Sequence, residues 1–315
     1  MKNAFRSAGL VPVAMLIVGA AAAQNYPNKS IRLVTVAPGS ANDIVARLIA
    51  QELRGALGQS VIVDNRGTIA AEFVARSSPD GYTLLLYGSA VWISPFIQKH
   101  ETGNPLRDLA PITLVASSPN VLVVHPSLPV KSVKELVALA KARPGELNYA
   151  AGSLGAAPHL ASELFKAMAG VDIVRVAYKG TGPSLIGLLG GQVEMMFPTA
   201  GSVTPHIKSG RLRALAVTSL KPSALAPGLP TMAEFLPGYE SVSLNGMFAP
   251  IKTPAAIVNL VNQEVARILN RPDAKERLSG AGMDAVVCSP DEFAATIKSE
   301  MAKWGKVIKD AGIHE

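Results

Sequence analysis

The chain has 315 residues, of which 49% are apolar and 17% are charged. This composition excludes a disordered or collagen-like chain, and the length predicts a folded protein of about two domains. The formal net charge of +7 is spread along the chain without runs of Lys and Arg or interleaved aromatic residues. We therefore expect no nucleic-acid partner.

The N-terminal segment has the layout of a secretory signal peptide. Lys2 and Arg6 precede a short run of small and apolar residues, and three alanines at 21–23 precede Gln24. The run is too short to span a bilayer. We expect residues 1–23 to be a signal peptide and the mature protein to lie in the periplasm. Its single cysteine, Cys288, cannot form an internal disulfide, so the fold must depend on its core.

The mature part alternates β-branched apolar runs with helical patterns. Ile31 to Val36 is expected to be a strand, and Asp43 to Leu57 an amphipathic helix that Gly58 ends. Further strands are expected at 61–63, 82–87, 121–124, 147–150, 173–177, 193–197 and 213–218, and further helices at 132–142, 158–168, up to 189, 254–270 and 289–311. Such alternation predicts an α/β fold with largely parallel sheets covered by helices.

Two proline-containing stretches, 125–132 and 222–230, are expected to be crossings between two domains. The predicted division is therefore 24–124 plus 222–315 for the first domain and 125–221 for the second. Ligands of open α/β sheets bind beyond the carboxyl ends of the strands. Three loops rich in Gly and small residues, "VAPGSAND", "AAGSLGAAPH" and "YKGTGP", are expected there, where helix-start amides can hold an anion.

Motifs for catalysis are incomplete. The sequence Ala151-Gly152-Ser153-Leu154-Gly155 has its first glycine one place away from a hydrolase elbow. "GTGPSLIG" lacks the spacing of a dinucleotide fingerprint, and no Gly-Lys-Ser/Thr follows a glycine turn. The five histidines are scattered singly, although His159, at a helix start, is expected either to touch a ligand or to shape its loop. Asp43 is expected to cap its helix. We expect no enzyme, no cofactor and no metal site.

Several stretches resemble one family of receptors. These include "PGSANDIVARLIAQELRGALGQSVIVDNR", "SPDGYTLLL", "NVLVVHPSLPVKSVKELVALAKARPGELNYA", "SLGAAPHLASELFKAMAGVDIVRVAYKGTGPSLIGLLGGQVEMMF" and "PHIKSGRLRALAVTS". The chain resembles the solute receptors of tripartite tricarboxylate transporters, also called the Bug family, over most of its mature length.

The resemblance implies a periplasmic binding protein with a two-lobed, type II-like fold, and we expect the mature protein to be a monomer. Two α/β domains would close like a flytrap on a small carboxylate, often with ordered water bridging the ligand to backbone groups. The receptor would then deliver the acid to the permease subunits of a membrane transporter. The ligand-binding residues that the resemblance implies are Pro38, Gly39, Ser40, Asn42, Asp43, Ser89, Ser153, Gly155, His159, Tyr178, Lys179, Gly180 and Thr199.

The sequence departs from the family pattern at three places. The first loop is one residue shorter than usual, and "DNRGTIAAEF" lacks about four residues of the loop that usually follows Asp-Asn-Arg. Pro198 stands where many relatives carry Asp. We expect a more open cleft wall near Arg66 and Gly67, and we do not assume an amino-acid ligand. Alternatives are a receptor of the same fold that signals to a membrane sensor and, more distantly, an α/β enzyme.

Overall fold

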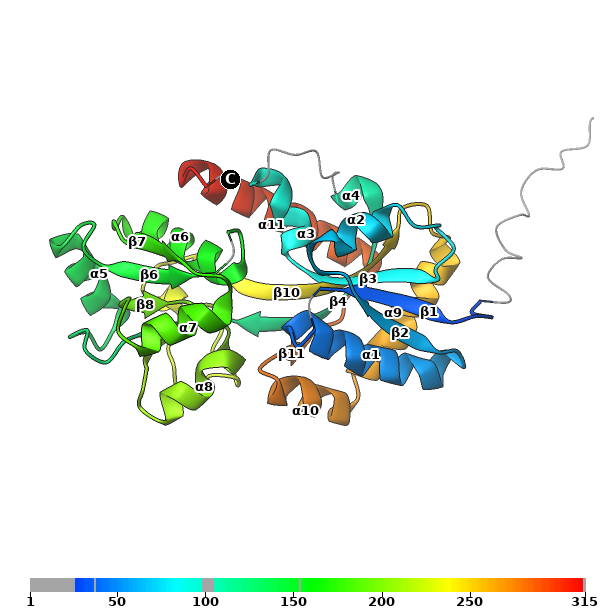
Figure 1. Ribbon diagram of the computed structural model, residues 1–315, viewed down its shortest axis with the longest axis horizontal. Coiled ribbons are helices and arrows are strands. Elements are labelled where there is room, and N and C mark those ends of the chain that lie inside the picture. The colour runs from blue at the N-terminus through cyan, green and yellow to red at the C-terminus, as the bar shows by residue number, and fades with distance from the viewer. Residues whose placement is uncertain (1–25, 37, 98–104, 153, 314–315) are drawn as a thin grey trace, which may run out of the picture.

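The computed structural model describes residues 26–36, 38–97, 105–152 and 154–313. The predicted signal peptide therefore lies outside the described residues. Two sheets organise the chain into two lobes, which lie side by side along the long axis of the molecule (Figure 1). In the described part, no helix has the length and apolarity needed to cross a membrane.

The first lobe is built on a mixed sheet with the strand order β11-β4-β10-β3-β1-β2. The parallel pairs are β1 with β2 and β1 with β3, whereas β10 runs antiparallel to β3 and β4. The strands are β1 (Ile31–Thr35), β2 (Val61–Asn65), β3 (Thr83–Gly88), β4 (Leu109–Pro119), β10 (Val242–Pro250) and β11 (Asp284–Ala285). The helices are α1 (Ala41–Leu57), η1 (Gly67–Ile69), α2 (Ala70–Ala75), α3 (Ala90–Ile93), η2 (Ser94–Phe96), α4 (Pro105–Asp108), α9 (Ala255–Leu269), α10 (Pro272–Gly280) and α11 (Pro290–Asp310).

The second lobe is built on a smaller mixed sheet with the order β7-β6-β8-β5-β9. Here β6 is parallel to β7 and β8, whereas β5 is antiparallel to β8 and β9. The strands are β5 (Val121–Val124), β6 (Asn148–Ala151), β7 (Val174–Ala177), β8 (Met195–Met196) and β9 (Arg213–Val217). The helices are α5 (Val133–Ala142), α6 (Ala157–Ala169), α7 (Thr181–Leu189), α8 (Ala200–Lys208) and η3 (Met232–Glu234).

Aromatic side chains fill the core of each lobe. In the first, the ring of Phe293 on α11 lies 6.0 Å from that of Trp92 and 5.0 Å from that of Phe248, between ring centroids. In the second, Phe197 lies 5.7 Å from Phe165 and 6.5 Å from Tyr239. These rings are fully buried, and such pairs stabilise a core beyond their area alone.

Two adjacent segments connect the lobes. The chain leaves β4 for β5 at Asn120 and returns from η3 to β10 at Ser241. Thr218 joins the two segments, because its backbone N–H donates to Asn120 O and its carbonyl accepts from Ser241 N, both at 3.0 Å. A two-stranded connection of this kind permits one lobe to rotate relative to the other.

The chain passes from one sheet to the other at positions other than those expected from the sequence. Val121–Val124 pair with β8 and β9, so they lie in the second sheet. Residues 222–230 also stay beside that sheet, because Thr231 forms a parallel bridge with Val217. We therefore propose domain boundaries at 120 and 241 in place of those at 125 and 222.

Two long strands had no sequence prediction, β4 and β10. Both carry residues that normally interrupt strands, such as Pro111 in β4 and Asn245-Gly246 in β10. Gly246 has a packing reason, since a Cβ there would lie 2.1 Å from Phe293 Cζ. The Asn245-Gly246 dipeptide, which is typical of turns, therefore lies in a strand here and leaves room for an aromatic ring to pack against the sheet.

Candidate functional site

A cleft of about 1310 Å³ lies between the two lobes. Its first-lobe wall includes the start of α1 and the residues after β3, and its second-lobe wall includes residues 154–158 and Thr199. Ser118 of β4 and Asn245 of β10 line it beside the inter-lobe connection. The cleft therefore lies at the carboxyl ends of the parallel strands β1, β3 and β6.

Within the described part of the chain, three helices of nine or more residues begin in the cleft wall. They are α1, α6 and α8, whose N-cap residues Ser40, Ala156 and Thr199 all line the cleft. The first amides of a helix have no intrahelical acceptor, and the helix dipole adds partial positive charge. The N-caps of α6 and α8 form no side-chain cap hydrogen bond. Helix starts from both lobes therefore present N–H donors to one space.

Two amide side chains, those of Asn42 and Asn245, lie close to Gly88 beside the start of α1. A Cβ built on Gly88 would lie 3.6 Å from Asn42 Nδ2 and 3.8 Å from Asn245 Oδ1. Asn42 Oδ1 is buried and has no hydrogen-bond partner among the described residues. A buried acceptor without a partner costs free energy, so a bound molecule or ordered water that donates to it would be stabilised.

Asp43 supports the first loop from behind the cleft wall. Its Oδ2 accepts from Gly39 N at 2.9 Å and from Arg47 Nε at 3.0 Å, and its Oδ1 accepts from Asn65 Nδ2 at 2.9 Å. Burial opposes the charge of Asp43, but these hydrogen bonds outweigh it and lower the pKa of the carboxyl. The expectation that Asp43 is the helix cap is wrong, because Ser40 is the N-cap and its Oγ accepts from Asp43 N.

His159 shapes the loop that follows β6. Gly155 N–H donates to His159 Nδ1 at 3.1 Å, so the ring must be neutral at Nδ1. Burial and the nearby Arg175 lower the pKa of His159 to about 4. On the other side of the loop, Arg175 Nη2 donates to Gly152 O at 3.3 Å. Of the two roles expected for His159, the geometry supports the one of shaping the loop.

The predicted site residues fall into three groups. Those that line the cleft are Ser40, Asn42, Ser89, Gly155 and Thr199. Those described outside the cleft lining are Pro38, Gly39, Asp43, His159, Tyr178, Lys179 and Gly180; Ser153 lies outside the described residues. Ligand binding by any of these residues stays a prediction.

The loop after β7 lies behind the loop after β6. A Cβ on Gly152 would lie 2.8 Å from the carbonyl carbon of Gly180, so these two backbones are in close contact. Tyr178 OH points to Gln192 Oε1 at 3.4 Å, and Ser184 Oγ donates to Gly180 O at 2.8 Å. The loop with Tyr178, Lys179 and Gly180 therefore supports the cleft wall in this geometry.

Glycine backbones from the two lobes touch at one edge of the cleft. Gly201, in the first turn of α8, faces the loop of Ala281 and Gly282 that follows α10. A Cβ on Gly201 would lie 2.9 Å from Ala281 O and 2.9 Å from Gly282 Cα. Ser118 Oγ donates to Gly282 O at 2.7 Å, which ties this loop to β4. Any larger residue at position 201 would separate the lobes here.

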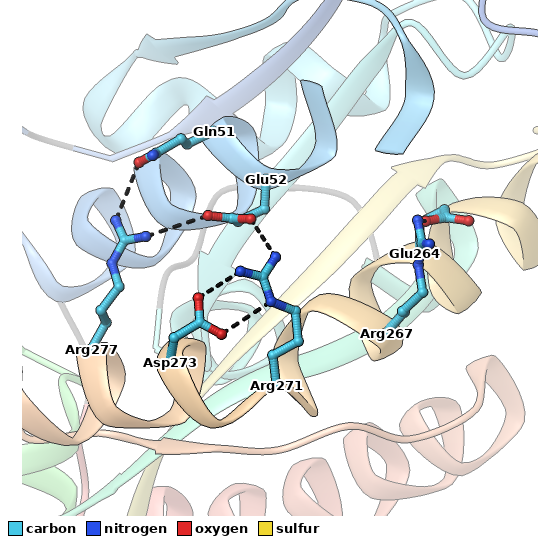
Figure 2. Close-up of polar contacts among 7 residues, drawn as sticks. All are labelled: Gln51, Glu52, Glu264, Arg267, Arg271, Asp273 and Arg277. Atoms are coloured by element: carbon cyan, nitrogen blue, oxygen red, sulfur yellow. Dashed lines mark hydrogen bonds and ion pairs between the residues drawn. The ribbon is translucent and has the colours of Figure 1, made fainter. Parts of the chain in front are cut away.

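A charged network on the first lobe holds α10 in place. Arg271 contacts Glu52 Oε2 of α1 through Nη1 at 2.6 Å and Asp273 Oδ2 through Nη2 at 2.6 Å (Figure 2). Arg277 donates to Gln51 Oε1 at 3.2 Å and lies 3.5 Å from Glu52 Oε1. Because α10 leads directly into Ala281 and Gly282, this network positions a part of the cleft wall.

Several cleft residues had no prediction from the sequence. Asn245, Ser118 and Gly282 lie on the missed strands or on the loop before β11, far in the chain from the Gly-rich loops. The Asn-Gly dipeptide at 245–246 was an available signal, but its ordinary interpretation is a hairpin turn. Only the pairing of β10 with β3 places Asn245 opposite Gly88.

Comparison with known proteins gives the family. Residues 45–313 match the tripartite tricarboxylate transporter family receptor. The chain is also 35% identical over 321 residues to protein BugT of Bordetella pertussis, covering 98% of each chain. The chain belongs to this receptor family. Members of this solute-binding family, such as BugD, are periplasmic binding proteins.

Solved structures of relatives share the two-lobed fold. A Rhodopseudomonas palustris protein, Rpa4515 with adipate, is 37% identical with a TM-score of 0.82, over 91% of this chain and 99% of its own. BugD is 33% identical with a TM-score of 0.78, over 92% and 100% of the two chains. MatC of R. palustris with bound malate is 30% identical with a TM-score of 0.75, over 90% and 100%. The type of fold expected from the sequence is thus confirmed.

Proposed function

We propose that this protein is a periplasmic receptor that captures a small organic carboxylate between its lobes and delivers it to the permease of a tripartite tricarboxylate-type transporter. The observation that carries the proposal is the convergence of helix starts from both lobes on one cleft. Receptors of the same family hold adipate and malate, which supports a carboxylate as the ligand.

The chemistry of the cleft suits an anion that is bound without being transformed. Free amides at the start of α1, α6 and α8 donate hydrogen bonds to carboxylate oxygens, and the three dipoles favour negative charge. A ligand held by donors from both lobes stabilises their closed arrangement over the open one. We propose that closure, in turn, is the signal that the permease recognises.

Asn42 supports a water-bridged mode of binding. An ordered water can donate one hydrogen to the buried Asn42 Oδ1 and its other hydrogen to a ligand carboxylate. Such a water satisfies the orphaned acceptor at a small entropic cost. In this arrangement, Asn42 and the bridging water help to hold a negatively charged ligand, and no basic side chain is needed.

A melting-temperature screen tests the proposal. The mature protein is mixed with mono-, di- and tricarboxylates, and an acid that binds the folded state raises the melting temperature with its concentration. Native mass spectrometry of the purified protein checks for a ligand carried through purification. If no acid in a broad panel has an effect and no ligand co-purifies, the proposal is wrong.

The variant Asn42→Asp tests the place of binding. An aspartate in the first turn favours the helix but brings negative charge to the cleft, so affinity for the acid should fall at least about tenfold while the fold is kept. The matched control is Asn259→Asp, the same change at an exposed position of α9. Equal affinity of both variants would mean that the acid does not bind beside the start of α1.

A further inference from the structure

We infer that the acid has a hydrocarbon body and no amino group. This inference rests on the proposed function and adds to it the class of ligand that the cleft selects. Two kinds of side chain that line the cleft beyond the helix starts bear on the ligand, the apolar ones and the carboxylates.

Apolar side chains form part of the cleft wall. Ile69, at the end of η1, lines the cleft with 56% of its surface exposed. Tyr87 and Leu154 are partly exposed and line it from the first and second lobe. A large apolar side chain exposed inside a cleft is stabilised when a ligand covers it, by about 25 cal/mol per Å² removed from water.

Buried apolar residues continue this wall. Val91 and Leu244 line the cleft and are only 7% and 9% exposed. Burial also raises the pKa of the Tyr87 hydroxyl, so the tyrosine presents a neutral ring to the cleft. A hydrocarbon chain or ring gains contact along these residues, whereas a body with several hydroxyl groups would lose hydration there.

The carboxylates of the described cleft lining already have cationic partners. They are Glu72 and Asp108. Glu72 Oε1 lies 2.6 Å from Arg76 Nη2, and Asp108 Oδ1 lies 3.0 Å from Arg107 Nε. The start of α1, where the ligand carboxylate is proposed to bind, contributes Ser40, Ala41 and Asn42 to the lining, none of which is anionic.

An α-ammonium group is disfavoured by the same feature that favours the carboxylate. In an amino acid the ammonium is attached to the carbon next to a carboxylate. Because α1, α6 and α8 begin in the cleft wall of both lobes, both carboxylates of a dicarboxylic acid can lie at helix starts, and an ammonium beside either one enters that space. There it would face positive dipole ends and lose hydration without a paired anion. An acid that lacks this group avoids both costs.

A matched pair of acids tests the inference. Isothermal titration calorimetry at pH 7 compares adipate with 2-aminoadipate, which has the same chain and carboxylates and one added ammonium. We expect 2-aminoadipate to bind at least about tenfold more weakly than adipate. Comparable or tighter binding of 2-aminoadipate would overturn the inference while leaving the carboxylate receptor intact. If neither these two acids nor the carboxylate panel binds, it is the proposed function that fails.

A matched pair of variants tests the apolar wall. Ile69→Asn keeps the number of side-chain heavy atoms but removes the hydrocarbon surface, and should weaken adipate binding by at least about fivefold. Ile62→Asn is the control, since Ile62 on β2 is 57% exposed and lies outside the cleft lining. Equal adipate affinity of the two variants would overturn the assignment of the wall, and circular dichroism confirms that both are folded.

Discussion

The contact between Gly201 and the loop of Ala281 and Gly282 allows a sharp test of lobe closure. Replacing Gly201 with alanine adds one methyl group 2.9 Å from the backbone atoms of the other lobe. Ordinary van der Waals contact begins at 3.4 Å, so the lobes must move apart by about 0.5 Å at this edge. Since the obstacle is backbone on both sides, side-chain rotation cannot relieve it.

The expected effect is on ligand affinity. Overpacking by one methyl costs about 1–3 kcal/mol, which the free protein avoids by opening but the closed complex does not. At about 1.4 kcal/mol per factor of ten, Gly201→Ala should bind its acid roughly 5- to 150-fold more weakly. Titration calorimetry measures the affinity, and thermal unfolding of the free protein should change little.

Gly182→Ala is the matched control for this test. Gly182 is the second residue of α7, as Gly201 is of α8, and both helices have nine residues. A Cβ on Gly182 meets nothing within 4 Å, and alanine is a better helix former. This variant should keep its affinity. If the two variants bind equally well, the glycine contact is absent from the ligand-bound state and the reasoning is refuted.

Three further predictions concern stability. The pKa of His159 is about 4 in the folded protein against 6.5 ordinarily, so the unfolded chain binds a proton at a higher pH than the folded one. The free energy of unfolding is therefore fully kept above pH 6.5 and falls by about 3 kcal/mol as the pH falls to about 4. Denaturant titrations should show this slope, and His159→Gln should reduce it. Phe293→Ala should cost about 3–5 kcal/mol because the ring is fully buried, and a loss below 1 kcal/mol would contradict the packing described. Glu52→Gln should cost at most about 1 kcal/mol, and this difference from wild type should vanish in concentrated salt; persistence in salt would show a role beyond its ion pairs.

The local elements followed from the sequence because their signals are local. Ser289, Pro290 and Glu292 predict a helix start, and the structure has a capping box there, with Ser289 Oγ accepting from Glu292 N at 3.2 Å. The helix α1 begins at Ala41, inside "VAPGSAND" and close to its predicted start at Asp43, since Ser40 has a side chain that satisfies a first-turn amide. The family also followed, from the resemblance of long stretches.

The strands β4 and β10 could not be found in this way, because their pattern is set by distant partners. The glycine at position 246 of β10 is explained by Phe293 of α11, whose ring occupies the space that a Cβ there would need. The crossings between the lobes also depend on distant partners. The sequence of Val121–Val124 suits a strand of either sheet, and only its pairing with β8 and β9 assigns it to the second. Proline-rich stretches were therefore an incomplete guide to the passage between lobes.

The sequence by itself determined the starts of α1 and α6 with their exposed amides, and with them the preference for an anion, whereas the helix α8 at Ala200–Lys208 was not expected. Only the tertiary structure decided which of those starts face one another. It placed Asn245 opposite Gly88 and set Gly201 against Gly282, and it put Asp43 and His159 behind the loops they support. The physical reason is that an amide or a cap depends on residues within one turn, whereas a cleft depends on side chains that sheet pairing brings together from distant parts of the chain.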